Sequence, residues 1–228
     1  MHNELLWLTL IIVNFTVTLI AFRYFGKVGL FIFAVISILL ANIQALKQID
    51  IFGLHGSMGD ISYMGVYLIS DILSENYGKD EARKLIGIGL FSTISATIIM
   101  YISLQLIPNN FDTAQQSLEQ IFGIFPRFVL ASICAFLVSQ SYDIVAYQFW
   151  RNKFPEFKYI WIRNGVSTTI SQIIDNLIFS FIAFIGVFEI KYIIEIFITS
   201  FILRTTITVI DTPFVYFSVF IKRKLKEI

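Results

Sequence analysis

The pattern Ser-Gln-x-x-Asp occurs twice inside long apolar stretches of the chain, at Ser139–Asp143 and at Ser171–Asp175. A stretch of about 20 apolar residues is what an α-helix needs to cross a bilayer. A carboxylate within such a stretch is costly, and it normally faces the interior of a helix bundle or a wet cavity. The repeated pattern therefore predicts a membrane protein that holds a polar, hydrogen-bonding object at membrane depth, as a transporter does.

The apolar character extends over the whole chain. Of the 228 residues, 57% are hydrophobic and only 14% are charged, whereas about a quarter of an ordinary soluble domain is charged. We therefore expect an all-α, polytopic membrane helix bundle of six to seven transmembrane helices, forming a single integral-membrane transporter domain over residues 1–228. The seven expected spans are Leu5–Phe22, Val28–Leu46, Ser57–Leu73, Leu85–Ile107, Ile121–Trp150, Gly165–Phe188 and Tyr192–Ile221. In a six-span alternative, the first segment is peripheral.

Basic residues divide unequally between the two sides of this arrangement. Thirteen lysines and arginines fall in the tail or near the loops that follow the first, third and fifth spans, against only Lys47 and Lys191 on the other side. Loops rich in lysine and arginine remain in the cytoplasm. The pattern predicts an external N-terminus and a cytoplasmic C-terminus.

Each copy of the repeat places a hydroxyl, an amide and a carboxylate on one helix face, because residues three and four apart are neighbours there. Two such patches facing each other could surround a flat polar heterocycle. The candidate binding residues are Gln140 and Asp143 in the first copy and Gln172 and Asp175 in the second. The alternative is a structural contact, in which Gln and Ser bond across a helix interface and each Asp is paired internally.

Three further charged residues lie in or near the spans. Asp71 lies near the cytoplasmic end of the third span and is a candidate site residue. Arg127 follows Pro126 near the outer end of the fifth span. It must pair with a residue on another helix, extend outward to the membrane interface or contact a substrate. Arg204 lies midway along the seventh span, where an internal ion pair with another intramembrane Asp and a direct role in binding are both open. No metal-ligand pattern is present, so neither a metal nor a cofactor is expected.

An ordered set of these segments resembles the queuosine precursor transporter family, also called the vitamin uptake transporter family. The segments are Ala41–Gln44 with Asn42, Ser70–Gly78 with Ala82 and Arg83, Arg127–Arg151, Ser167–Phe184, and Arg204 with Pro213. The likeness covers most of the chain from about Ala41 onward. It implies a bacterial inner-membrane importer of 7-deazaguanines such as 7-cyano-7-deazaguanine and 7-aminomethyl-7-deazaguanine. Members of the family are usually described with six spans and as working without an ATPase module.

The chemistry of such a substrate agrees with the repeat. A guanine-like edge presents N1–H and N2–H₂ donors beside an O6 acceptor, so Asp143 or Asp175 can accept both donors while Gln140 and Gln172 frame the ring. Phe or Tyr faces can stack on it, and Asp71 is a candidate partner for a charged aminomethyl group. The partners implied are this small molecule and the lipid bilayer, without nucleic acid, and a homodimer is compatible with the sequence.

Other classes of function remain open to different degrees. The alternative is a substrate-binding membrane subunit of an energy-coupling-factor-type vitamin importer, which needs a separate ATPase. An intramembrane enzyme is disfavoured, because the Tyr142-Asp143 pair lacks the Gly-x-Gly-Asp motif that aspartyl intramembrane proteases require. A channel is disfavoured because the polar groups form patches rather than one ring. The sequence selects neither the preferred precursor nor the source of energy.

Overall fold

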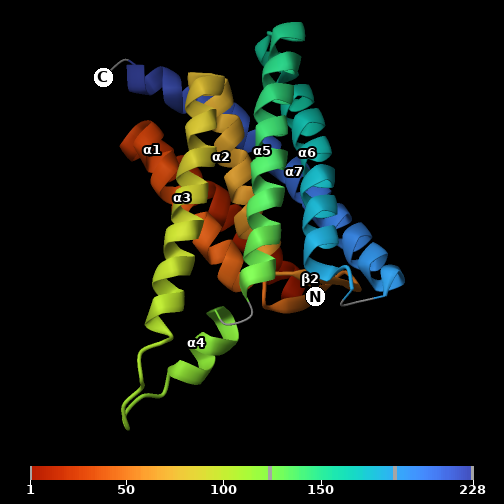
Figure 1. Cartoon of the computed structure of the whole chain (residues 1–228). Helices are drawn as coiled ribbons and strands as arrows, with labels where there is room; N and C mark the ends of the chain where they lie inside the picture. The colour runs from red at the N-terminus through yellow and green to blue at the C-terminus, as the bar shows by residue number, and fades with distance from the viewer. Residues whose placement is uncertain (1, 123–124, 187–188, 227–228) are drawn as a thin grey trace.

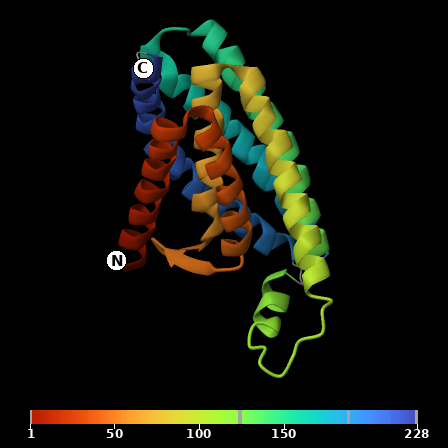
Figure 2. The ribbon, with the colours of Figure 1, turned by 90° about the vertical axis from the view of Figure 1, so that its left-hand side faces the viewer.

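The computed structural model describes residues 2–122, 125–186 and 189–226, apart from the side chains of residues 54–55, 125–128, 184, 192 and 225–226. It is 86% helical, which confirms the all-α helical bundle. The helices, in chain order, are α1 (His2–Gln44), α2 (Gly59–Tyr77), α3 (Lys79–Ser103), α4 (Gln115–Phe122), α5 (Phe125–Lys153), the 3₁₀ turn η1 (Phe157–Tyr159), α6 (Ile160–Phe184) and α7 (Ile190–Lys226). The N- and C-termini lie at opposite ends of the bundle (Figures 1 and 2).

Helix α1 is one element of 43 residues with a sharp break at Gly26. Gly26 has φ 60° and ψ −142°, a left-handed backbone that a residue without a Cβ adopts at little cost. Figure 2 shows the result, in which the first arm rises from the N-terminus and the second arm returns toward the starting end. The two arms correspond to the first two expected spans.

A short antiparallel hairpin joins α1 to α2, and the sequence analysis did not predict it. Its strands are β1 (Gln48–Ile51) and β2 (Leu54–Ser57). The two turn residues, Phe52 and Gly53, both have positive φ, which is the backbone of the tight turn whose twist matches that of paired strands.

Within the described residues, five helices are long and apolar enough to cross a membrane: α1, α3, and most of α5, α6 and α7. Helix α2 is not among them. Its 19 residues include the three acidic residues Asp60, Asp71 and Glu75, and 15 of the 19 are buried, so the rest of the bundle encloses it. The expected fifth span, Ile121–Trp150, was wrong at its start because Ile121 belongs to α4 and a separate helix begins at Phe125.

The bundle places apolar side chains outside and polar ones inside. Phe91 and Ile99 on α3 are 74% and 62% exposed, as befits side chains that face lipid, while Asp71, Gln140 and Asp143 have no exposed surface. Backbone and side-chain polar groups at membrane depth must find partners within the protein. Helices α2, α5, α6 and α7 form a ring in which each helix packs against the next. A polar site therefore belongs in the interior of this ring.

Candidate functional site

A polar stripe runs along the enclosed helix α2. Asp60, Tyr63, Tyr67, Asp71 and Glu75 follow one another at intervals of three or four residues, so they share one face of the helix. That face meets polar side chains of α5, α6 and α7 along its whole length, as the hydrogen bonds below establish. The site is thus a polar column inside the bundle rather than a single pair of carboxylates.

The two copies of the repeat face each other and are hydrogen-bonded reciprocally. Ser139 Oγ of the first copy donates to Asp175 Oδ1 of the second at 3.1 Å. Ser171 Oγ of the second copy donates to Asp143 Oδ1 of the first at 3.0 Å. All four side chains are buried. This exchange fixes the register of the neighbouring helices α5 and α6, so part of each repeat is a structural contact.

One end of the column is an ion-pair network, which we call the Arg204 network: Asp60, Tyr63, Ser139, Asp175 and Arg204. The Arg204 guanidinium donates to Asp60 Oδ1 at 2.8 Å and to Asp175 Oδ2 at 2.7 Å. Tyr63 Oη donates to Asp175 Oδ1 at 2.7 Å, and its ring lies 5.4 Å from the guanidinium. Both oxygens of Asp175 are therefore occupied, and Arg204 forms the internal ion pair that the sequence had left open.

The middle of the column contains three carboxylates, Asp71, Asp143 and Asp211, which we call the acidic group. Each has no exposed surface. Each accepts one hydrogen bond from α6: Asp143 from Ser171 as above, Asp71 Oδ2 from Thr168 Oγ1 at 3.1 Å, and Asp211 Oδ1 from Asn164 Nδ2 at 2.7 Å. The second oxygen of each carboxylate is buried without a hydrogen-bond partner in the described part of the chain.

The acidic group differs from the Arg204 network in having no counter-charge. Asp71 interacts electrostatically with Asp143 and Asp211, and Asp211 with Asp143. Among the side chains that the structure describes, no lysine or arginine forms an ion pair with any of the three. Uncompensated buried charge is strongly unfavourable, so this region favours a positively charged or donor-rich occupant.

The opposite end of the column has its own cations, in what we call the Glu75 network: Glu75, Tyr147, Arg151 and Arg163. Arg163, 1% exposed, lies 3.4 Å from Glu75 Oε1, and Tyr147 Oη donates to Glu75 Oε2 at 3.0 Å. Arg151 donates to the Ser74 carbonyl at 2.6 Å. The acidic group thus lies between two regions that contain arginine.

Several neutral polar groups in the column also lack partners within the described residues. Gln140 is fully buried, and neither its amide nitrogen nor its oxygen has a hydrogen bond. Gln172 donates from Nε2 to Thr208 Oγ1 at 2.6 Å, while its Oε1 is unpaired. The Tyr67 hydroxyl is buried and lies close to Ser139, Asp143 and Asp175. Unpaired buried polar groups cost about 1–3 kcal/mol each, so these are natural contacts for a ligand.

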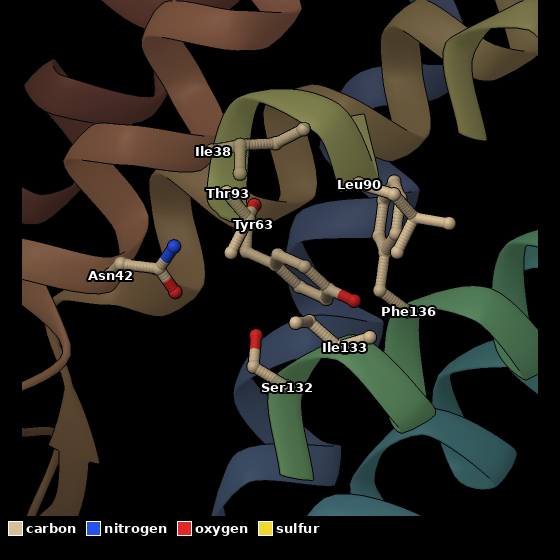
Figure 3. A pocket seen from close by; sticks show the side chains of 8 residues that line it. All are labelled: Ile38, Asn42, Tyr63, Leu90, Thr93, Ser132, Ile133 and Phe136. Atoms are coloured by element: carbon tan, nitrogen blue, oxygen red, sulfur yellow. The ribbon is translucent and has the colours of Figure 1, made fainter. Parts of the chain in front are cut away.

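The helices are closed around these groups. Figure 3 shows a cavity beside the Arg204 network, where Tyr63 lies among Asn42, Thr93 and Ser132. Its volume is about 10 Å³, room for about one water molecule and not for a ring. A heterocyclic ring could enter this cavity only if the helices separate.

The predicted site residues divide into three sets. Asp71, Gln140, Asp143, Gln172, Asp175 and Arg204 all lie in the column. Asn42 lines the small cavity beside it, and the side chain of Arg127 lies outside the described residues. The sequence analysis missed Asp60, Tyr63, Asn164 and Thr168. The spacing of acidic and tyrosine residues along α2 was the signal that could have indicated two of them.

Comparison with known proteins gives related chains. The family model described as "Putative vitamin uptake transporter" matches residues 57–218. A Bacillus subtilis protein named "Probable queuosine precursor transporter" is 35% identical over 216 residues, covering 95% of this chain and 94% of that protein. The Escherichia coli "Queuosine precursor transporter" is 25% identical over 162 residues, covering 71% and 70% of the two chains. No solved structure matches this chain.

Proposed function

Since the chain belongs to the vitamin uptake transporter family, and is a multi-pass membrane transporter rather than an enzyme, we propose that it imports 7-deazaguanine precursors of queuosine. The names of its relatives from Bacillus subtilis and Escherichia coli support this substrate class. Substrates of the class include 7-cyano-7-deazaguanine and 7-aminomethyl-7-deazaguanine. The membrane in question is the bacterial inner membrane.

The observation that carries the proposal is the set of unpaired groups around Asp143. Asp143 Oδ2 and both polar atoms of Gln140 are buried without partners among the described residues, and the two side chains lie on one face of α5. In our proposal, the carboxylate accepts the N1–H and N2–H₂ donors of the base. The amides of Gln140 and Gln172, which offer both donors and acceptors, frame the rest of the ring. Tyr67 supplies an aromatic face for stacking.

Asp175 has a different role in this proposal. Its two oxygens already accept bonds from Arg204, Tyr63 and Ser139, so it has little capacity left for a base. It holds α2, α5, α6 and α7 together at one end of the column. The Glu75 network does the same for α2, α5 and α6 at the other end, and opening one end at a time would give alternating access.

We further propose seven membrane crossings with a cytoplasmic C-terminus, in one transporter domain over residues 1–228. The two arms of α1 that diverge from Gly26 support counting α1 twice (Figure 2). The enclosed helix α2 would be a seventh crossing, shielded from lipid by its neighbours. The break in α1, the junction of α2 with α3, the end of α5 and the end of α7 lie at one end of the bundle (Figure 1). Basic residues cluster in these segments of the sequence, so this end would face the cytoplasm.

Reconstitution of the purified chain into liposomes tests the function. We expect uptake of labelled 7-aminomethyl- or 7-cyano-7-deazaguanine by the chain alone, without ATP and without a second protein. Uptake only after addition of an ATPase module would instead identify a substrate-binding subunit. Failure to restore queuosine-modified tRNA in a precursor-requiring, importer-deficient bacterium, with the protein present in the membrane, would contradict the proposed substrate class.

A further inference from the structure

Three oxygens left unpaired around Asp71 and Asp211 are acceptors, while the unpaired hydroxyls of Ser70 and Ser74 on α2 can donate or accept. Asp71 Oδ1 and Asp211 Oδ2 have no hydrogen-bond partner in the described part of the chain. Asn164 extends this set, because its Nδ2 donates to Asp211 at 2.7 Å and to Thr212 at 3.0 Å while its Oδ1 is unpaired. Asn164 is fully buried. The Asn164 amide oxygen is a neutral acceptor, and its lack of a partner points to a missing donor.

Three unpaired acceptor oxygens, two of them from carboxylates, favour a particular kind of ligand. A primary ammonium has three N–H donors and no acceptor, which matches Asp71, Asp211 and Asn164. It also supplies the positive charge that the described side chains around the acidic group lack. A neutral nitrile, by contrast, is an acceptor alone and would add a fourth acceptor to the set.

The spacing along α6 fits a base with a charged arm. Asn164, Thr168 and Ser171 hold Asp211, Asp71 and Asp143 respectively. From Asn164 to Ser171 is seven residues, or about 10 Å along the helix axis. This is comparable to the length of a two-ring base with a one-carbon arm, so Asp143 can hold the ring edge while Asp71 and Asp211 hold the end of the arm.

We propose that Asp71, Asp211 and Asn164 bind the ammonium group of the substrate, so that the transporter prefers 7-aminomethyl-7-deazaguanine to the neutral 7-cyano compound. This inference rests on the proposed function and adds to it the residues that determine specificity. The ring edge, common to both compounds, binds at Asp143. The charged arm distinguishes them.

Equilibrium binding of both compounds to the purified full chain in lipid nanodiscs tests the proposal. We expect the wild-type chain to bind the aminomethyl compound roughly ten-fold or more tightly than the cyano compound, the effect of a charge-assisted hydrogen bond. In Asp211→Asn, this ratio should fall toward one because the aminomethyl compound loses most affinity. Asp80→Asn is the control, since the Asp80 side chain is 84% exposed and forms an ion pair with Arg83 on the surface, and it should keep the wild-type ratio.

Three outcomes would overturn the proposal. The first is equal affinity of the wild-type chain for both compounds, or an equal loss of affinity for both in Asp211→Asn. Either result would show that these residues do not bind the charged arm, while the proposed function would stand. If binding of the cyano compound depends on sodium and Asp211→Asn removes that dependence, the acidic group holds an inorganic cation instead. If neither compound binds the folded wild-type chain, the proposed function itself is wrong. If Asp211→Asn fails to fold, the ratio of the two affinities is measured in Asp71→Asn instead.

Discussion

The two copies of Ser-Gln-x-x-Asp have the same sequence pattern but opposite surroundings. Asp175 is held by an arginine, a tyrosine and a serine. Asp143 accepts a hydrogen bond from Ser171 and has the hydroxyls of Ser167 and Thr168 nearby, and its second oxygen has no partner among the described residues. The difference arises from the neighbouring helix α7, which brings Arg204 to Asp175 and Asp211 to the surroundings of Asp143. In our proposal, one copy of the repeat stabilises the bundle while the other binds the ligand.

Removal of Arg204 should have the largest effect on this comparison. Arg204→Ala leaves Asp60 and Asp175 buried without their cation, and removing one partner of a buried ion pair costs about 3–5 kcal/mol. We expect a corresponding loss in the free energy of unfolding, measured by denaturant titration in detergent micelles. Arg83→Ala is the matched control, because its ion pair with Asp80 is exposed and is worth about 1 kcal/mol at most. Equal stabilities of the two variants would refute a structural role for the Arg204 network.

Neutralising the two repeat aspartates should separate stability from binding. Asp143→Asn should weaken binding of the 7-deazaguanine by about 1.5–3 kcal/mol, the worth of a charge-assisted hydrogen bond. Its unfolding free energy should not fall, because the amide oxygen still accepts from Ser171 and the substitution removes an uncompensated buried charge. Asp175→Asn should instead lower stability, because Arg204 loses a partner. Both quantities are measurable on the same purified variants, by ligand titration and by denaturant titration.

Two results would contradict this division. Wild-type affinity in both folded variants would exclude the repeat from the site. Loss of binding in Asp175→Asn at unchanged stability, together with loss of stability in Asp143→Asn, would reverse the roles that we assign.

Much of the architecture followed from the apolar runs, because a run of about 20 such residues has few alternatives to a membrane helix. The reversal at Gly26 was anticipated only as a gap between two spans, and the structure supplies its cause in the backbone of Gly26. The β-hairpin and the start of α5 were missed. Short strands and the separation of α4 from α5 depend on local turns that an apolar average does not detect.

The sequence predicted several residues of the site, but it did not predict which of them pair with one another. Polar residues three and four apart predicted the patches on α5 and α6, because helix geometry fixes which residues share a face. Which carboxylate meets Arg204 depends on how α7 packs against α6 and α2, whereas Asp143 and Asp175, which end two copies of the same pattern, look equivalent in sequence. The same limit hid Asp60, whose role depends on contact with Arg204, 144 residues later.

The smallest expected effect concerns the serines that the two repeats exchange. Ser139→Ala removes one of several bonds to Asp175, which keeps Arg204 and Tyr63. Ser171→Ala removes the hydrogen bond to Asp143 Oδ1, and Oδ2 of that buried carboxylate already has no partner among the described residues. Because an unsatisfied buried group costs more than a lost bond at a satisfied one, Ser171→Ala should be the less stable variant by about 1 kcal/mol. Denaturant titration of the two alanine variants measures this difference directly. A greater loss of stability in Ser139→Ala would contradict the assignment of the additional hydrogen-bond partners to Asp175.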